Sequence, residues 1–292
     1  MKLDHSNKRH IIDSLGWIHY RQVLPRDLLE EIRNQIIDQL VLRGLKNYFF
    51  QKSELDSASV RFYRRNPAQL PVLQAMLPRL PAVYQLALLP LIGDLLEESI
   101  GWSQAALSPI HNLRAKLPWR LNRSAFTNVP WHQDYGASDP TVDGVRLMTV
   151  WIPLSPASLR HGGLEIIPRS NHLGWLSHRR GECGPEVNMA AMRDALHEND
   201  KLSPVFIQAS AGDVIIFDQL TLHRSLRNKS NICRWSLDFR YAAFGRSTGR
   251  PGQWDRDPRI GEDIENGIMK LVQQRSSSSV PIRKRVDDIS AF

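Results

Sequence analysis

The chain has 292 residues, 42% of them hydrophobic, with a formal net charge of +8 and no internal repeat. This length and hydrophobic content suit one domain with a sizeable core and exclude a chain of repeated modules. Two cysteines exclude a disulfide framework, and no run of 18 apolar residues is present to cross a membrane. Because no apolar stretch of signal-peptide type follows the basic N-terminus, we expect a cytoplasmic protein without membrane contact.

The positive charge has three interpretations. We favour a solvated basic surface, because the arginines are scattered over residues 61–65, 178–180 and 246–259. The second is an anionic handle on a small-molecule substrate, which arginine side chains would bind through paired hydrogen bonds. Nucleic acid comes last and is not expected as a partner, since no stacking aromatic residues alternate with the arginines.

The N-terminal third is predicted to be mostly helical. Pro25 precedes a segment with apolar residues at a spacing of 3.6, and Gly44 ends it. Residues 70–100 predict two or more helices that are broken at prolines. We therefore expect residues 1–105 to form a helical buttress. The apolar stripe of the first helix consists of Leu28, Leu29, Ile32, Ile36, Ile37 and Leu40.

The middle of the chain holds its only His-x-Asp sequence, His132-Gln133-Asp134. Side chains at positions i and i+2 of a strand point to the same face, about 6.6 Å apart at about 3.3 Å per residue. His132 and Asp134 would then face one metal ion, while Gln133 points away. In isolation such a sequence is more often a surface pair, so the metal interpretation depends on the rest of the chain.

A hairpin is predicted over residues 221–241, since a polar turn separates two segments of strand-forming residues. The centre of the turn places Ser225 opposite Arg234 and His223 opposite Ser236. If His223 faces inward, the other three side chains face inward with it.

An inward-facing Arg234 needs an anionic partner, because a buried guanidinium without one is costly. One interpretation is an internal ion pair with Asp213, Asp218 or Asp238. The other is that Arg234 binds one carboxylate of a dicarboxylate co-substrate, whose other end chelates a metal ion held by His223. Two histidines and one carboxylate can hold Fe(II) and leave positions free for a co-substrate and O2.

Three segments together resemble the phytanoyl-CoA dioxygenase family, to which ectoine hydroxylase is related. They are Val129–Leu154, Gly162–Gly174 and Asp213–Tyr241. The resemblance implies a mainly β fold with flanking helices. This fold is a double-stranded β-helix, a jelly-roll (cupin-like) barrel buttressed by the N-terminal helices, with Fe(II) and 2-oxoglutarate bound at its mouth.

Residue by residue, the resemblance implies that His132, Asp134 and His223 ligate the iron. Arg234 matches the arginine that pairs with the distal carboxylate of 2-oxoglutarate. Ser225 matches a hydroxyl that contacts the same carboxylate.

Two further positions belong to the co-substrate site by the same resemblance. Trp151 corresponds to a tryptophan that lines this site, and Thr149 shares its strand face by alternation. Asn228 matches a frequent family asparagine, which we interpret as turn chemistry.

The implied reaction consumes O2 and 2-oxoglutarate and yields succinate and CO2, while a C–H bond of a small molecule is hydroxylated. Asp134 favours oxygenation over halogenation, because halogenating relatives carry a small residue at that position. Desaturation, epoxidation or cyclisation begin at the same centre and stay open. A non-catalytic barrel that binds a metal or an anion is the alternative of a different class.

The expected organisation is a single dioxygenase domain over residues 1–292. Within it, the buttress spans 1–105 and the barrel core spans 106–245. Residues 174–203 are expected to be an insertion that covers the substrate, and residues 246–292 a C-terminal cover or tail.

Overall fold

The computed structural model describes seven stretches of the chain, namely residues 11–45, 54–108, 111–123, 128–137, 145–181, 184–199 and 201–245. The expected C-terminal cover or tail, residues 246–292, lies outside the described residues. The helices are α2 (Arg26–Leu42), α3 (Leu55–Arg65), α4 (Gln69–Met76), α5 (Pro81–Ala87), α6 (Pro90–Ile100) and α7 (Met189–His197).

The strands fall into three groups. The larger sheet contains β1 (Trp17–Tyr20), β9 (Val214–Asp218), β4 (Leu147–Pro153), β11 (Arg234–Ala243), β2 (Ala105–Leu107) and β3 (Asn112–Lys116). The smaller sheet contains β10 (His223–Ser225), β5 (Leu164–Ile166) and β8 (Val205–Ile207). The strands β6 (His178–Gly181) and β7 (Gly184–Val187) form a separate antiparallel pair.

Every strand pair in the two main sheets is antiparallel, and the chain passes repeatedly from one sheet to the other. A compact apolar cluster, with Trp151, Ile166 and Phe217 among its members, joins side chains of both sheets. Antiparallel sheets that face each other across a shared interior are typical of jelly-roll architectures. The expected fold is confirmed as a double-stranded β-helix with flanking helices.

Alternation along β11 separates the two faces of the larger sheet. Trp235, Leu237 and Phe239 pack into the apolar core shared with the helices. Arg234 and Ser236 point the opposite way and line a cavity between the sheets. Successive strand residues face opposite sides, so one strand supplies both the helix-packing surface and the polar interior.

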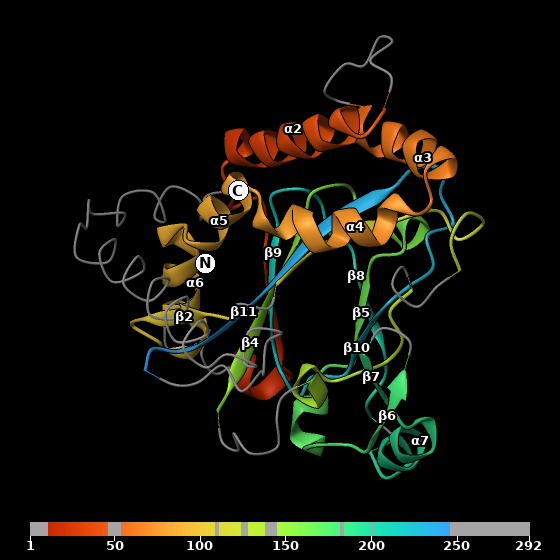
Figure 1. Ribbon diagram of the computed structural model, residues 1–292. Coiled ribbons are helices and arrows are strands. Elements are labelled where there is room, and N and C mark those ends of the chain that lie inside the picture. Colours follow the sequence, from red (N-terminus) through yellow and green to blue (C-terminus); the bar gives the residue numbers. More distant parts are fainter. Residues whose placement is uncertain are drawn as a thin grey trace, which may run out of the picture.

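The helices cover the apolar face of the larger sheet, with α2, α3 and α4 lying across it in Figure 1. Helix α2 buries five of the predicted stripe residues, and each contributes about 2 kcal/mol of stability. The helix ends at Leu42, and Gly44 follows with a φ of +98°, the left-handed conformation that glycine adopts without a Cβ clash. The helical buttress is therefore present, with helix breaks at Pro81 and Pro90 where prolines were predicted to break it.

Residues within the expected insertion form β6, β7 and α7, which lie together beyond the smaller sheet in Figure 1. They pack through a third apolar cluster that includes Val187, Met192 and Leu196. Trp131 and Leu222 belong to the same cluster, and each lies directly beside a histidine of the expected metal site. The insertion is thus anchored next to that site.

No single helix among those the structure describes is long and apolar enough to span a membrane. A bent pair, Gln69–Arg79 with Pro81–Ile100, meets the length and composition criterion only when its two halves are counted together.

Candidate metal centre

Two histidines are brought together by backbone pairing. His132 and His223 form an isolated antiparallel bridge, in which each backbone N–H donates to the carbonyl of the other at 3.1 Å. Side chains of directly opposed residues lie on the same face. The two rings are therefore neighbours, with centroids 4.0 Å apart, and both line the cavity between the sheets.

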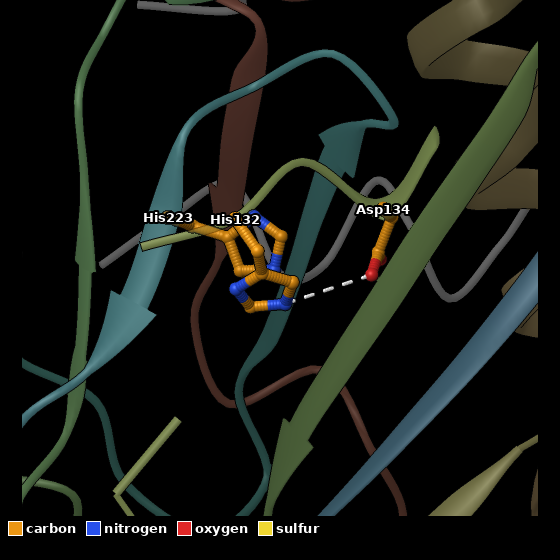
Figure 2. Close-up of side chains that lie close together, drawn as sticks. All are labelled: His132, Asp134 and His223. Carbon is orange, nitrogen blue, oxygen red and sulfur yellow. Dashed lines mark ion pairs between the residues drawn. The ribbon is translucent and has the colours of Figure 1, made fainter. Parts of the chain in front are cut away.

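The backbone at Asp134 differs from the prediction. The expected strand does not continue through this residue, because Asp134 begins a short 3-10 helix that ends at Ala137. The carboxylate nevertheless turns toward the histidines, and its Oδ1 lies 3.8 Å from His132 Nε2. Figure 2 shows the two imidazole rings side by side and the carboxylate directed at them. The predicted convergence is present, although a bend and not strand alternation produces it.

Hydrogen bonds select the tautomer of each imidazole. The Nδ1 of His132 lies 2.9 Å from the carbonyl of Pro130, and the Nδ1 of His223 lies 2.9 Å from that of Thr221. A carbonyl only accepts, so Nδ1 carries the proton and Nε2 keeps its lone pair. Burial lowers the pKa of His223. Burial and the neighbouring imidazole lower the pKa of His132 to about 3. Both rings are therefore neutral near pH 7, the form that binds a metal.

The three side chains fit a metal ion. One ligand atom from each of His132, Asp134 and His223 lies within 4.8 Å of the other two. Two neutral imidazole nitrogens and one carboxylate oxygen form the facial donor set of non-haem Fe(II) centres, in which the remaining positions stay open. The second nitrogen of each histidine is fixed by a backbone carbonyl, as is usual for metal-binding imidazoles.

The metal-facing histidines line a cavity between the two sheets. Six of the seven predicted site residues line it. They are His132, Thr149, Trp151, His223, Ser225 and Arg234. Asp134 is not among the lining residues but hydrogen-bonds to two of them, Thr149 and Arg240.

Arg234 lies at one end of this cavity and is only 3% exposed. Its Nη1 donates to Ser236 Oγ at 2.7 Å, whereas its Nε has no hydrogen-bond partner among the described residues. The guanidinium lies 5.5 Å from the ring centroid of Trp151. Burial lowers the pKa of Arg234 to about 10.

The internal ion pair considered for Arg234 is not found among the described residues, because each predicted aspartate has another partner. These partners are His19 for Asp213, Arg146 for Asp218, and Arg114 with Arg240 for Asp238. A buried guanidinium in a cavity, without a carboxylate, favours the interpretation that it receives an anion from outside.

The predicted hairpin is wrong in its pairing. Ser225 on β10 pairs with Leu164 on β5, and Arg234 on β11 pairs with Lys116 on β3. The two strands belong to different sheets, and the turn between them crosses the gap. The expectation that Ser225, Arg234, His223 and Ser236 share an interior is nevertheless met, because all four line the cavity.

Lys116 adds a second buried cation to the Arg234 end of the cavity. It is 2% exposed, and its Nζ donates to Ser225 Oγ at 2.7 Å. Lys116 and Arg234 are cross-strand partners, and Ser225 and Arg234 both line the cavity. Sequence reasoning did not assign Lys116 to the site, because the pairing of β3 with β11 was not predicted.

Thr149 contacts the candidate metal ligand directly. Its hydroxyl donates to Asp134 Oδ2, in a short hydrogen bond. The other carboxylate oxygen, Oδ1, lies 3.1 Å from Arg240 Nη2. Arg240 was missed in the sequence, although a signal existed. Arg234, Ser236, Asp238 and Arg240 are polar at alternate positions of β11, and strand parity puts them on the interior face.

Gln133 also has a part that the sequence did not predict. It points away from the metal site, as expected, and its side chain is held by the carbonyls of Gly174 and Leu220 and by the N–H of Leu176. Its backbone N–H donates to His178 Nε2 at 3.2 Å. Gln133 therefore ties the metal-ligand segment to the start of the insertion.

Known proteins resemble this chain in sequence and in fold. The family model described as phytanoyl-CoA dioxygenase (PhyH) matches residues 13–236. A comparison with curated proteins gave no match.

Solved structures share the fold at low sequence identity. The non-haem alpha-ketoglutarate-dependent carbocyclase SnoK from nogalamycin biosynthesis is 18% identical, with a TM-score of 0.58 over 89% of this chain and 91% of that chain. EctD from S. alaskensis, with 2-oxoglutarate and 5-hydroxyectoine, is 15% identical, with a TM-score of 0.55 over 82% and 77%. The epimerase SnoN, in complex with Fe3+, alpha-ketoglutarate and nogalamycin RO, is 17% identical, with a TM-score of 0.53 over 84% and 87%.

The family model covers most of the sequence, including both histidines and the aspartate of the candidate centre. The chain therefore belongs to the phytanoyl-CoA dioxygenase (PhyH) family of Fe(II)- and 2-oxoglutarate-dependent oxygenases.

Proposed function

We propose that this oxygenase hydroxylates an unactivated C–H bond of a small molecule, with release of succinate and CO2. The observation that carries the proposal is the convergence of His132, Asp134 and His223, whose two imidazoles are held as neutral ligands. This donor set leaves one side of an Fe(II) ion open to a co-substrate and O2.

The bound iron would supply the activation of O2, and the residues supply binding and orientation. His132 and His223 would hold the ion through Nε2, while their Nδ1 protons stay on backbone carbonyls. Asp134 would add the anionic ligand through Oδ1, the oxygen that faces His132.

The far carboxylate of 2-oxoglutarate would bind Arg234. Arg234 Nε has no other partner among the described residues, and a two-pronged carboxylate contact would satisfy it. Ser225 and Lys116 lie at the same end, where a hydroxyl and a second cation would complete the contact. Trp151 would form an apolar wall of the co-substrate site beside the guanidinium.

Hydroxylation is favoured because Asp134 keeps the anionic ligand in place, so a halide has no vacated position to take. The solved structures of similar fold include a carbocyclase and an epimerase, which motivates a test for cyclised, desaturated, epoxidised or epimerised products. Product mass separates hydroxylation and epoxidation, which add one oxygen atom, from desaturation and oxidative cyclisation, which remove two hydrogens, and from epimerisation, which leaves the mass unchanged. NMR of the product distinguishes the outcomes within each pair.

An anionic substrate is our proposal for the remaining part of the cavity. Arg114 and Arg224 both line it, at 27% and 37% side-chain exposure. Each already pairs with one carboxylate, and a guanidinium has donors left for a second.

We further propose that residues 1–292 form a single domain and that the protein is cytoplasmic.

The test is turnover of 2-oxoglutarate to succinate by the purified protein with Fe(II), ascorbate and O2. We expect slow succinate formation even without the true substrate, and its loss in His132→Ala and His223→Ala. A wild-type protein that binds Fe(II) and 2-oxoglutarate but forms no succinate, with any of a panel of candidate substrates, would point to the non-catalytic barrel instead.

A further inference from the structure

The carboxylate of Asp134 is engaged at both oxygens by residues of two neighbouring strands. Thr149 on β4 donates to Oδ2, and Arg240 on β11 reaches Oδ1 at 3.1 Å. We infer that Arg240, with Thr149 as its counterpart, is a positioning residue that fixes which oxygen of Asp134 faces the metal. The inference rests on the proposed function and concerns how its iron site is built.

Thr149 and Arg240 are directly opposed in the sheet. They are Cα partners in the antiparallel pairing of β4 with β11, so one cross-strand pair contacts both oxygens of the same carboxylate. The backbone of Asp134 lies in a bend and not in the sheet, and the chain alone does not orient this side chain. The two contacts therefore set its rotation about the bond to the carboxyl carbon.

Arg240 is itself held rigidly. It is 5% exposed, and its Nη1 bonds to Asp238 Oδ1 at 2.5 Å. Asp238 receives further hydrogen bonds from Asn112 at 2.6 Å and from Arg114 at 2.7 Å. The charges alternate from Arg114 through Asp238 and Arg240 to Asp134. Each guanidinium is thus compensated where it is buried, as a buried charge requires.

The geometry directs one oxygen of the carboxylate toward the candidate metal position and the other away from it. Oδ1 is 3.8 Å from His132 Nε2, whereas Oδ2 is turned toward β4 and accepts the Thr149 proton. An unrestrained carboxylate can bind a metal ion through both oxygens, which would occupy a second coordination position. Holding Oδ2 away from the metal keeps that position available to the co-substrate or O2.

Electrostatics and positioning predict opposite effects on metal affinity. Arg240 places a positive charge beside a site for a divalent cation, so loss of the charge alone would tighten metal binding. If Arg240 acts by orienting Asp134, its loss weakens metal binding, as for other residues that orient metal ligands, by about 10- to 100-fold.

The experiment measures Co(II) binding to the purified full-length protein by calorimetry and by the visible absorption of bound Co(II), which reports its coordination number. We expect Arg240→Gln and Thr149→Val to weaken Co(II) binding by about 10-fold or more and to alter the absorption. Arg240→Lys should restore part of both. Thr149→Val keeps the side-chain shape, so it provides a second test of the inference if Arg240→Gln does not fold.

The matched control is Arg33→Gln. Arg33 lies on α2, is half-buried and bonds to the carboxylate of Asp56, but it does not line the cavity. The Arg33→Gln substitution should lower the stability of the protein and leave its Co(II) affinity and absorption unchanged.

Unchanged or tighter Co(II) binding with a wild-type absorption, in folded Arg240→Gln or Thr149→Val, would overturn the inference alone. A wild-type protein that binds neither Co(II) nor Fe(II) would overturn the proposed function, and the inference with it.

Discussion

Arg234 is the residue whose surroundings say most about the co-substrate. Its guanidinium is buried without a carboxylate among the described residues, and its lowered pKa of about 10 reflects that burial. Leaving a buried charge uncompensated costs several kcal/mol in a protein interior. An anion that enters the cavity would recover that cost, so binding and stability are linked at this position.

The first prediction concerns Arg234→Gln. Loss of a charge-assisted contact worth about 1.5–3 kcal/mol should raise the KM for 2-oxoglutarate by about 10- to 100-fold. Fe(II) binding should persist, because the side chain does not touch the metal ligands. Succinate formation at varied 2-oxoglutarate concentration measures the effect.

Pyruvate, which lacks the distal carboxylate, provides the control for Arg234→Gln. The wild type and the variant should bind pyruvate with similar weak affinity, since neither can make the contact. A variant that keeps the wild-type KM for 2-oxoglutarate would remove Arg234 from the co-substrate site.

At the scale of elements, the metal-ligand segment is held from two sides. The bridge to His223 joins it to the smaller sheet, and Gln133 joins it to the insertion. His178, which accepts the Gln133 N–H, is stacked on Trp175 at 4.0 Å with an interplanar angle of 3°. The insertion therefore fixes the backbone that carries two of the candidate metal ligands.

The second prediction follows from the burial of Gln133, which is 1% exposed. Gln133→Leu keeps the volume but leaves two carbonyls and one N–H without their partner. The cost of such orphaned groups is about 1–3 kcal/mol each, so we expect a loss of about 3 kcal/mol in the free energy of unfolding, measured in urea. Amide exchange at Leu176 should accelerate, because its N–H loses its acceptor.

Gln74→Leu is the matched control for Gln133→Leu. Gln74 lies half-buried on α4 and makes no side-chain hydrogen bond among the described residues. A change within about 0.5 kcal/mol is expected there. An equal loss of unfolding free energy at both positions would mean that the hydrogen bonds from Gln133 to the insertion add nothing to stability.

The element scale also shows which parts of the fold the sequence could predict. Helix α2, its stripe and its glycine stop follow from local periodicity and chain stiffness, and all were found where expected. The pairing of β10 with β5 could not be predicted, because the turn at Asn228 looks the same whether the chain folds back or crosses to another sheet. Asn228 is buried and bonds to the Lys116 carbonyl, a contact that requires β3 to be nearby.

The candidate site was easier to predict than the pairing. Strand parity depends only on residue spacing, so Arg234 and Ser236 face the cavity whichever strand lies next to them. Contacts that join distant segments were beyond reach. Arg240 to Asp134 and Lys116 to Ser225 each span more than 100 residues of sequence, and only the folded topology brings them together.

For the whole molecule, buried neutral histidines link stability to pH. Burial lowers the pKa values of His19, His111 and His223 below the usual 6.5, and that of His132 to about 3. In the unfolded chain these groups take up protons near pH 6.5, whereas in the folded protein they do not. Unfolding therefore binds protons below that pH, and stability falls as the pH falls.

The third prediction is that the metal-free protein loses at least about 2 kcal/mol of unfolding free energy between pH 6.5 and pH 5. The free energy of unfolding falls by about 1.4 kcal/mol per pH unit for each proton taken up on unfolding. Urea titrations at both pH values measure the loss. His132→Gln should show a smaller pH dependence, since it removes one of the protons. Constant or rising stability over this range would contradict the assigned neutral state.

The crossing from β10 to β11 has a consequence for molecular length. His223 sits on the smaller sheet and Arg234 on the larger one, so the proposed iron and the proposed anion anchor are attached to opposite walls of the barrel. The distance between the two walls then limits the length of the diacid that can bind the iron at one end and Arg234 at the other. Under the proposed function, this spacing would favour one length of 2-oxo diacid, which oxaloacetate and 2-oxoadipate, one carbon shorter and one longer than 2-oxoglutarate, would test. Selection by length among the 2-oxo diacids would thus depend on how the two sheets pack.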